Sequence, residues 1–294
     1  MTPAQIWRLS RPVTLTASVV PVAVGAAAGA MGLPVSWPLL ADMALVALLL
    51  QAATNMTNEY HDFVRGLDQR GAVGIAGVLV NGELEREAVR RAFLTTFLVA
   101  IALGLVLAWL RGPLLLALGL LSVAVAYLYN AGPWPISATP FGEATVFLVM
   151  GPLEVLVSEV AAVGRATGAG LAASVPVAAL VAAILLANNL RDREADAAHG
   201  RRTLPILVGE RRAGLVLTGL VALAFAWPVV AWATGLLPWP ALVILIGVPA
   251  GVAVVRAVGP ASTDRRRAVP QTARLELVAG GLLAVGLVLS RLHP

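Results

Sequence analysis

The chain has 294 residues, of which 59% are hydrophobic and 13% charged, and its mean hydropathy is +0.86. Soluble domains carry about 25% charged residues, so this composition excludes a soluble enzyme and favours a polytopic membrane protein that forms one domain over residues 1–294. The net charge of +5 comes from arginines in short loops between apolar segments, which argues against a nucleic-acid partner. The absence of cysteine excludes disulfides and thiolate chemistry.

Nine apolar stretches are long enough to cross a bilayer, at about 20 residues each. They lie near residues 13–32, 38–58, 91–110, 113–130, 142–162, 171–190, 212–234, 238–257 and 274–291. The first ten residues show no signal-peptide cleavage pattern, so we expect the first span to be retained. We therefore predict an all-α fold in which about nine transmembrane helices surround a central cavity.

The arginines orient these spans. All but three of the 21 basic residues fall on one side of the predicted bundle, and only Arg111, Arg165 and Arg291 fall on the other. The positive-inside rule makes the crowded side cytoplasmic. We therefore expect a multi-pass protein of the plasma (inner) membrane, with a cytoplasmic N-terminus and an external C-terminus.

Two polar segments interrupt the hydrophobic chain, both on the predicted cytoplasmic side. The first motif covers residues 55–68, where Asn55, Asn58, Glu59 and Asp62 recur every three or four residues and so share one helix face. Gly66 is expected to end that helix and let the loop carrying Asp68 fold back.

The second motif covers residues 188–205. It places Asn188, Asp192 and Asp196 at i, i+4 and i+8, which also puts them on one face if the helix continues. The two faces can meet across a cavity, and the cavity is predicted to open toward them.

Paired acidic faces of this kind suit a divalent metal and a phosphorylated ligand. Mg²⁺ prefers oxygen ligands and is usually held by one or two carboxylates together with substrate phosphates. A diphosphate leaving group gains negative charge as its carbon–oxygen bond breaks, and cations must neutralise that charge. The arginines placed to help are Arg65, Arg191, Arg201 and Arg202.

The sequence resembles the UbiA superfamily of intramembrane aromatic prenyltransferases, and within it the menaquinone-branch 1,4-dihydroxy-2-naphthoate prenyltransferases. Their first motif, N-x-x-N-D-x-x-D-x-x-x-G-x-D, is matched here except that Glu59 replaces an aspartate. Their second motif, N-N-x-R-D-x-x-x-D followed by a basic residue and T-L, is matched from Asn188 to Leu204. Residues 11–15, 129–133 and 141–143 resemble their R-P-x-T-L segment and central loop.

The resemblance implies transfer of a polyprenyl group from its diphosphate to 1,4-dihydroxy-2-naphthoate, with decarboxylation, in menaquinone biosynthesis. The cofactor it implies is Mg²⁺, held by Asp62, Asp68, Asp192, Asp196 and Glu59. Asn58 joins Asp62, Asp192 and Asp196 in the catalytic set. The residues expected to bind the substrates are Arg11, Asn55, Tyr60, Arg65, Tyr127, Tyr129, Glu143, Asn188, Arg191 and Arg202.

Several alternatives remain open. Val157 and Glu159 depart from the family pattern in the fifth span, so the acceptor can instead be hydroxybenzoate, homogentisate or a lipid-linked molecule. Glu154, in the middle of that span, is either a paired polar residue or part of the cavity. A transporter and a non-catalytic prenyl-lipid binder are the non-enzyme alternatives, although transporter sites normally lie near the bilayer midplane.

Overall fold

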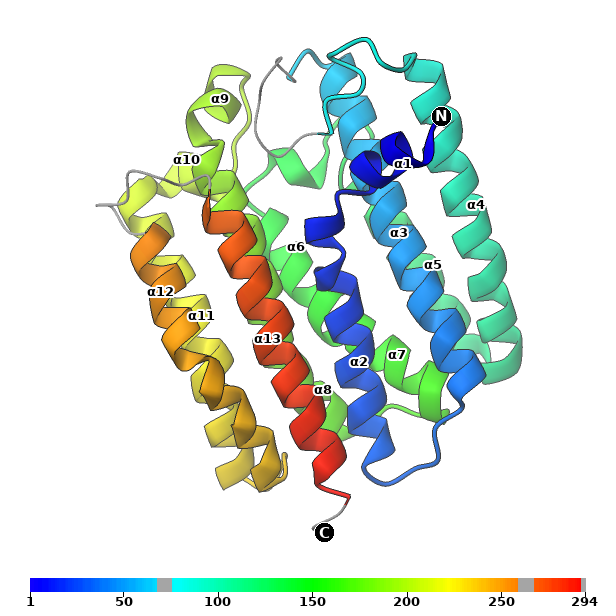
Figure 1. The fold of residues 1–294 in the computed structure, drawn as a ribbon, viewed down its shortest axis with the longest axis vertical. Helices are drawn as coiled ribbons and strands as arrows, with labels where there is room; N and C mark the ends of the chain where they lie inside the picture. The colour runs from blue at the N-terminus through cyan, green and yellow to red at the C-terminus, as the bar shows by residue number, and fades with distance from the viewer. Residues whose placement is uncertain (68–75, 259–266, 292–294) are drawn as a thin grey trace.

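The computed structural model describes residues 1–67, 76–258 and 267–291, and this part of the chain is helical without a strand. The long helices lie side by side as a bundle (Figure 1). In chain order the α-helices are α1 (Pro3–Ser10), α2 (Thr16–Ala30), α3 (Trp37–Val64), α4 (Arg86–Arg111), α5 (Pro113–Leu128), α6 (Gly142–Leu148), α7 (Glu154–Val163), α8 (Gly168–Arg191), α9 (Arg193–Ala198), α10 (Leu204–Val208), α11 (Glu210–Ala233), α12 (Val248–Val258) and α13 (Ala268–Leu289).

Three stretches of other helix types extend these elements. A 3₁₀ turn (Pro12–Thr14) precedes α2, and a longer 3₁₀ segment (Trp239–Gly247) runs directly into α12. A π-helical segment (Val149–Leu153), which contains Pro152, joins α6 to α7. As a result, Gly142–Val163 and Trp239–Val258 each form one continuous span.

Eight helical stretches within the described residues are long and apolar enough to cross a membrane. They coincide with eight of the nine predicted spans, which confirms a multi-pass, all-α membrane protein. The remaining predicted span, 113–130, forms α5, which has 16 residues and is shorter than the others. The number nine therefore stays a prediction.

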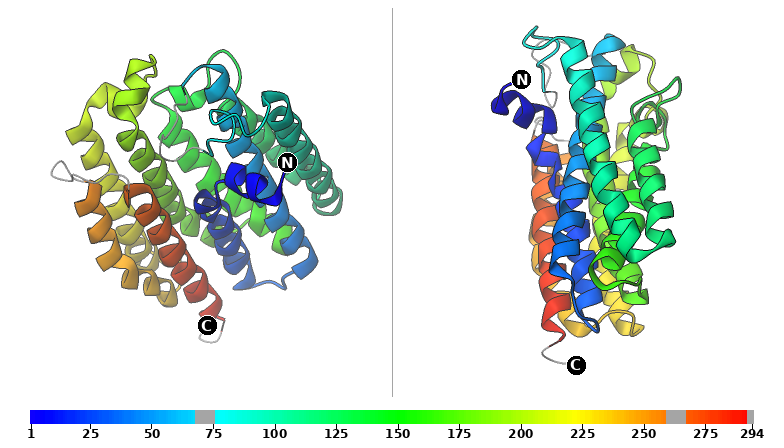
Figure 2. Two further views of the ribbon diagram at one scale, coloured as in Figure 1. Left: turned by 45° about the horizontal axis from the view of Figure 1, so that its top comes forward. Right: turned by 90° about the vertical axis from the view of Figure 1, so that its right-hand side faces the viewer.

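The two polar motifs lie at the same end of the bundle. The C-terminal end of α3 and the short helices α9 and α10 lie at the same end of the bundle as α1, whereas α13 ends at the opposite end of the molecule (Figures 1 and 2). Both motifs consequently face the same aqueous boundary, where their charges do not have to be buried in lipid.

Helix packing differs between the two sides of the bundle. On α2, a Cβ built at Gly25 or Gly29 would lie 2.3 Å from the Val155 carbonyl oxygen or 2.6 Å from Val163, so only glycine allows α2 and α7 to approach this closely. Gly104 on α4 and Gly119 on α5 have no neighbouring atom within 4 Å of such a Cβ. A small apolar cavity of about 70 Å³ lies among α3, α4 and α5.

Candidate active site

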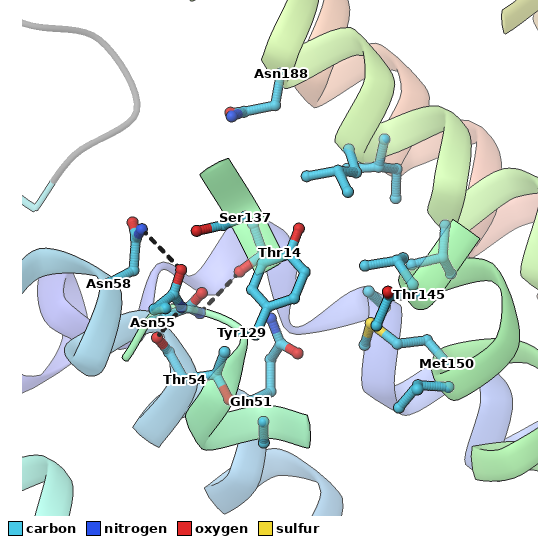
Figure 3. A pocket seen from close by; sticks show the side chains of 18 of the residues that line it. Thr14, Gln51, Thr54, Asn55, Asn58, Tyr129, Ser137, Thr145, Met150 and Asn188 are labelled. Carbon is cyan, nitrogen blue, oxygen red and sulfur yellow. Dashed lines mark hydrogen bonds between the residues drawn. The ribbon is translucent and has the colours of Figure 1, made fainter. Parts of the chain in front are cut away.

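A cavity of about 350 Å³ lies inside the bundle, below the end that carries the two motifs. Figure 3 shows Asn58 on the left of this cavity, Asn188 at the top, Tyr129 in the centre and Met150 on the right. The predicted site residues that line it are Arg11, Asn55, Asn58, Asp62, Tyr129, Asn188, Arg191, Asp192 and Asp196. The structure thus brings together the two motifs, which are more than a hundred residues apart in the sequence.

The first motif occupies the last turns of α3. Asn58 donates from Nδ2 to Asp62 Oδ2 at 2.9 Å and to Asn130 Oδ1 at 3.2 Å, which fixes the Asp62 carboxylate toward the cavity. The helix ends at Val64, and Gly66 has the left-handed φ of +71° that allows Leu67 N–H to donate back to the Asp62 carbonyl. The expected role of Gly66 as a helix stop is confirmed. Asp68 lies outside the described residues.

The second motif is divided between two helices. The sequence predicted one helix face for its acidic residues, but α8 ends at Arg191 and α9 begins at Arg193, with Asp192 at the junction. Arg191 holds this junction, donating from Nη2 and Nε to the two Asp192 carboxylate oxygens at 2.6 and 2.7 Å. The same Nη2 donates to Asn188 Oδ1 at 2.8 Å. The motif therefore reaches the cavity as a bent, cross-linked segment.

Arg201 connects the two motifs. Its Nη2 lies 2.5 Å from Asp62 Oδ1 and its Nη1 lies 3.2 Å from Asp196 Oδ1, and all three side chains are 11–14% exposed. Its Nε is buried without a hydrogen-bond partner. The sequence marked Arg201 only as one of several nearby arginines, and the family pattern assigned the basic position to Arg202. The Arg201 guanidinium therefore places a positive charge between the carboxylates of the first and second motifs at the cavity mouth.

Electrostatics at the mouth follow from this crowding. Burial raises the pKa of Asp196 to about 6. The Arg201 guanidinium opposes that shift, while the charges of Asp192 and Asp62 add to it. Burial alone would lower the pKa of Arg201, but its carboxylate neighbours raise it, so Arg201 stays charged. The mouth therefore holds more carboxylates than Arg201 alone can neutralise.

Glu59, predicted as a metal ligand, lies outside the cavity lining. Its side chain is fully buried and accepts backbone N–H groups from Ala76 at 2.9 Å and Val78 at 3.2 Å, with Arg11 Nη2 at 3.5 Å. The extra methylene that distinguishes it from aspartate takes its carboxylate toward the segment that follows the first motif. In this structure Glu59 anchors that segment.

Five other predicted substrate-binding residues do not line the cavity. Tyr60 packs against Phe93, and Tyr127 packs against Phe97. Arg65 donates to the carbonyls of Asn130 and Gly132, each at 3.0 Å, and so fixes the central loop. The other two lie beside cavity residues: Glu143 accepts from Asn189 Nδ2 at 2.9 Å, and Arg202 uses its backbone N–H to bind the Ala138 carbonyl.

Arg11, Asn55 and Tyr129 form the rest of the polar mouth. Asn55 donates from Nδ2 to the Ser10 carbonyl at 2.8 Å and to Thr14 Oγ1 at 2.9 Å, which ties the N-terminal segment to α3. Arg11 has a left-handed φ of +48°, and its buried Nε has no partner. The Tyr129 hydroxyl is also buried without a partner, and burial raises its pKa, so it remains a neutral phenol.

The donor set fits magnesium together with a diphosphate. The described residues hold no group of three carboxylate or histidine side chains close enough to enclose a metal ion. A Mg²⁺ ion bound here would therefore rely on one or two of Asp62, Asp192 and Asp196, with phosphate oxygens completing its shell. The unpartnered Nε atoms of Arg11 and Arg201 are suitable donors to such phosphates.

Fold and site together define a class: an intramembrane helical protein whose cavity has a charged mouth and an apolar interior, suited to an amphiphile with an anionic head. The sequence profile of the UbiA prenyltransferase family matches residues 18–278, and the chain belongs to this family. The protein is thus a multi-pass membrane prenyltransferase, which confirms the enzyme class and the fold predicted from the sequence.

Similar proteins agree with this assignment. The chain is 37% identical to the 1,4-dihydroxy-2-naphthoate octaprenyltransferase of Bacillus subtilis over 97% of its length and 92% of the relative's length. It is 35% identical to the enzyme of the same name from Mycobacterium tuberculosis, covering 87% of this chain and 85% of that one.

Solved structures show the same fold. A UbiA homologue from Aeropyrum pernix K1 superposes with a TM-score of 0.71 at 20% identity, covering 94% of this chain and 97% of that one. A UbiA homologue from Archaeoglobus fulgidus bound to GPP and Mg²⁺ superposes with a TM-score of 0.66 at 16% identity, covering 97% and 99%.

Proposed function

We propose that the protein transfers a polyprenyl group from polyprenyl diphosphate to 1,4-dihydroxy-2-naphthoate, in a Mg²⁺-dependent reaction that also removes the acceptor carboxyl group and gives demethylmenaquinol, the reduced form of demethylmenaquinone. The observation that carries the proposal is the mouth of the cavity, where Arg201 lies between Asp62 and Asp196 above an apolar interior. The naphthoate acceptor is supported by the names of the relatives that are 35–37% identical over most of the chain.

The polar mouth is suited to the diphosphate. Mg²⁺ bound there would neutralise the charge that develops on the leaving oxygen. Asp62, Asp192 and Asp196 would hold the ion, and Asn58 orients Asp62 through its 2.9 Å hydrogen bond. Arg11 and Arg201 supply fixed positive charge beside the phosphate oxygens, where a water-poor site makes such charge most effective.

The apolar interior is suited to the prenyl chain and to the carbon that reacts. As the carbon–oxygen bond breaks, positive charge develops on the allylic carbon, which water would capture if it reached the site. Methionine, leucine and valine side chains of α3, α5 and α8 exclude water there. Tyr129 is the one predicted tyrosine that lines the cavity, and its ring can stabilise a cation.

We also propose that the charged end of the bundle faces the cytoplasm in a bacterial inner membrane. The N-terminus and both motifs share that end, and the sequence assigns all but three of the 21 arginines to this side of the predicted bundle. The positive-inside rule then places the end of α13 outside.

The test uses purified protein in detergent with labelled geranylgeranyl diphosphate, 1,4-dihydroxy-2-naphthoate, and either Mg²⁺ or EDTA. We expect a decarboxylated, prenylated naphthohydroquinone, detected as the naphthoquinone after oxidation in air, that forms only with Mg²⁺. Diphosphate release without this product would refute the acceptor and direct a screen of hydroxybenzoate and homogentisate. Absence of diphosphate release with every chain length would refute the proposed reaction for this protein.

A further inference from the structure

Two carboxylic acids lie in the interior of the bundle, away from the charged mouth. Glu154 is the first residue of α7, directly after the π-helical segment, and its side chain lines the cavity. Glu276 on α13 is fully buried, and neither of its carboxylate oxygens makes a hydrogen bond, although the Thr16 hydroxyl lies near. The helices that carry them, α7 and α13, both pack against α2. We refer to Glu154 and Glu276 as the interior carboxyl pair.

Within the described residues, no ion pair includes either glutamate. Ser18 of α2 lines the same cavity as Glu154. A polar group that is kept without a partner in such a place needs a functional explanation.

The pair lies at the depth of an acceptor bound below the diphosphate. Thr14 Oγ1 accepts the hydrogen bond from Asn55 at the mouth. Ser18, four residues further along, lies about one helical turn, or about 6 Å, deeper. Glu154 lines the same cavity as Ser18 and therefore faces the zone beneath the polar mouth. On α13, Glu276 follows the cavity-lining Val269 by seven residues, which puts both on the same helix face.

We propose that Glu154 binds a ring hydroxyl of the aromatic acceptor and exchanges a proton with it during prenyl transfer, while Glu276 positions Glu154 from behind. The inference rests on the proposed function, because it requires an acceptor with an acidic hydroxyl. Glu154 touches the substrate and is a catalytic residue in this scheme. Glu276 acts through Glu154 and is a positioning residue.

The proton balance of the reaction suits such a carboxyl. When the ring carbon forms its bond to the prenyl carbon, the bond to the diphosphate oxygen breaks and its electron pair leaves with the diphosphate. The acceptor O–H bond breaks in the same phase, the oxygen becomes a carbonyl, and the proton passes to Glu154. Loss of CO₂ then returns an electron pair to that carbonyl oxygen, which takes the proton back. No net proton is consumed, so one carboxylate that accepts the proton and then returns it is sufficient.

The experiment compares purified E154Q and E276Q with the wild type, measuring kcat and KM separately for the acceptor and for geranylgeranyl diphosphate. We expect E154Q to reduce kcat by about 10²–10⁴-fold, the usual contribution of a positioned acid–base group. Its acceptor KM should rise, while KM for the diphosphate changes by less than about twofold. E276Q should lose less activity than E276V, because an amide keeps a polar group at this position and valine does not.

E159Q is the matched control. Glu159 is a buried acid on the same helix, but it binds the backbone N–H and hydroxyl of Thr167 at 3.0 and 2.6 Å and does not line the cavity. Its loss should leave the acceptor KM unchanged. A folded E154Q protein with wild-type kcat and acceptor KM would overturn the proposal.

A second measurement does not depend on the variants folding. Methylating one acceptor hydroxyl at a time removes the proton that Glu154 takes, so one of the two monomethyl ethers should be a poor substrate for the wild type. Equal turnover of both ethers and the parent acceptor would overturn the proposal. If the wild type prenylates no aromatic acceptor at all, the proposed function fails instead, and the two failures are thereby separated.

Discussion

Replacing Arg201 with glutamine tests whether this residue neutralises the carboxylates of the cavity mouth in the absence of metal. Arg201 contacts Asp62 at 2.5 Å and Asp196 at 3.2 Å, and both carboxylates are about nine-tenths buried. Removing one partner from a buried ion pair costs about 3–5 kcal/mol, because it leaves an uncompensated charge. Protonation of Asp196, whose pKa is about 6, relieves part of that cost. We therefore expect R201Q to lose about 3 kcal/mol of stability in EDTA at pH 7.

The assay is thermal unfolding in detergent, in EDTA and again in Mg²⁺ with inorganic diphosphate. For a protein of this size, a loss of about 3 kcal/mol lowers Tm by about 6–12 °C. Magnesium should reduce the difference between R201Q and wild type, because the metal ion replaces the missing positive charge. R90Q is the control: Arg90 pairs with Glu87 on the surface of α4, and such exposed pairs contribute about 0.3–0.5 kcal/mol. If the Tm of R201Q lies below that of wild type by the same amount with and without Mg²⁺, the positive charge of Arg201 does not substitute for that of the metal ion.

Four further predictions concern the acidic residues of the mouth and the neighbouring Glu59. D192N should nearly abolish turnover with little change in Tm, because an amide is a poor Mg²⁺ ligand; a folded D192N enzyme with wild-type kcat would contradict the metal site. Mn²⁺ affinity, measured by titration between pH 5 and 7.5, should fall about tenfold per pH unit below pH 6, because protons compete for Asp196, and D196N should remove this dependence. Because folding raises the pKa of Asp196 from 3.8 to about 6, its ionisation disfavours the folded state, so stability in EDTA should decrease as the pH rises across that range. E59D should be less stable by about 1–3 kcal/mol, since a shorter carboxylate leaves the Ala76 and Val78 N–H groups unbound; unchanged unfolding of E59D would rule out the anchoring role.

The sequence predicted the membrane fold and the meeting of the two motifs because both depend on local patterns. Apolar length determines where a helix can span, and three- or four-residue spacing determines which side chains share its face. Gly66 was predictable for the same reason, since a glycine after a polar helix end usually takes a left-handed conformation.

The misplaced residues depend on contacts between distant segments. Glu59 has the right spacing for a ligand, but the backbone N–H groups of Ala76 and Val78 determine where its carboxylate points. Arg201 binds Asp62, which lies 139 positions earlier in the chain, and the spacing of residues along one helix cannot predict such a contact. The helix breaks at Asp192, where Arg191 binds the Asp192 carboxylate, and the i, i+4 spacing of the acidic residues does not predict this break.

Unequal packing around the cavity determines which walls can move. Gly25 and Gly29 bring α2 against α7 so closely that these two helices, which carry Ser18 and Glu154, must travel as one rigid body. The α4–α5 hairpin is different, because a Cβ built at Gly104 or Gly119 would meet no atom within 4 Å and a small void lies among α3, α4 and α5, although α4 packs along α3. Side chains Met43, Leu50, Ser122 and Val157 border both that void and the main cavity. We therefore expect fluctuations of these side chains to connect the two spaces. The hairpin is then the part of the bundle that widens for long hydrocarbon chains, while the opposite wall keeps its geometry.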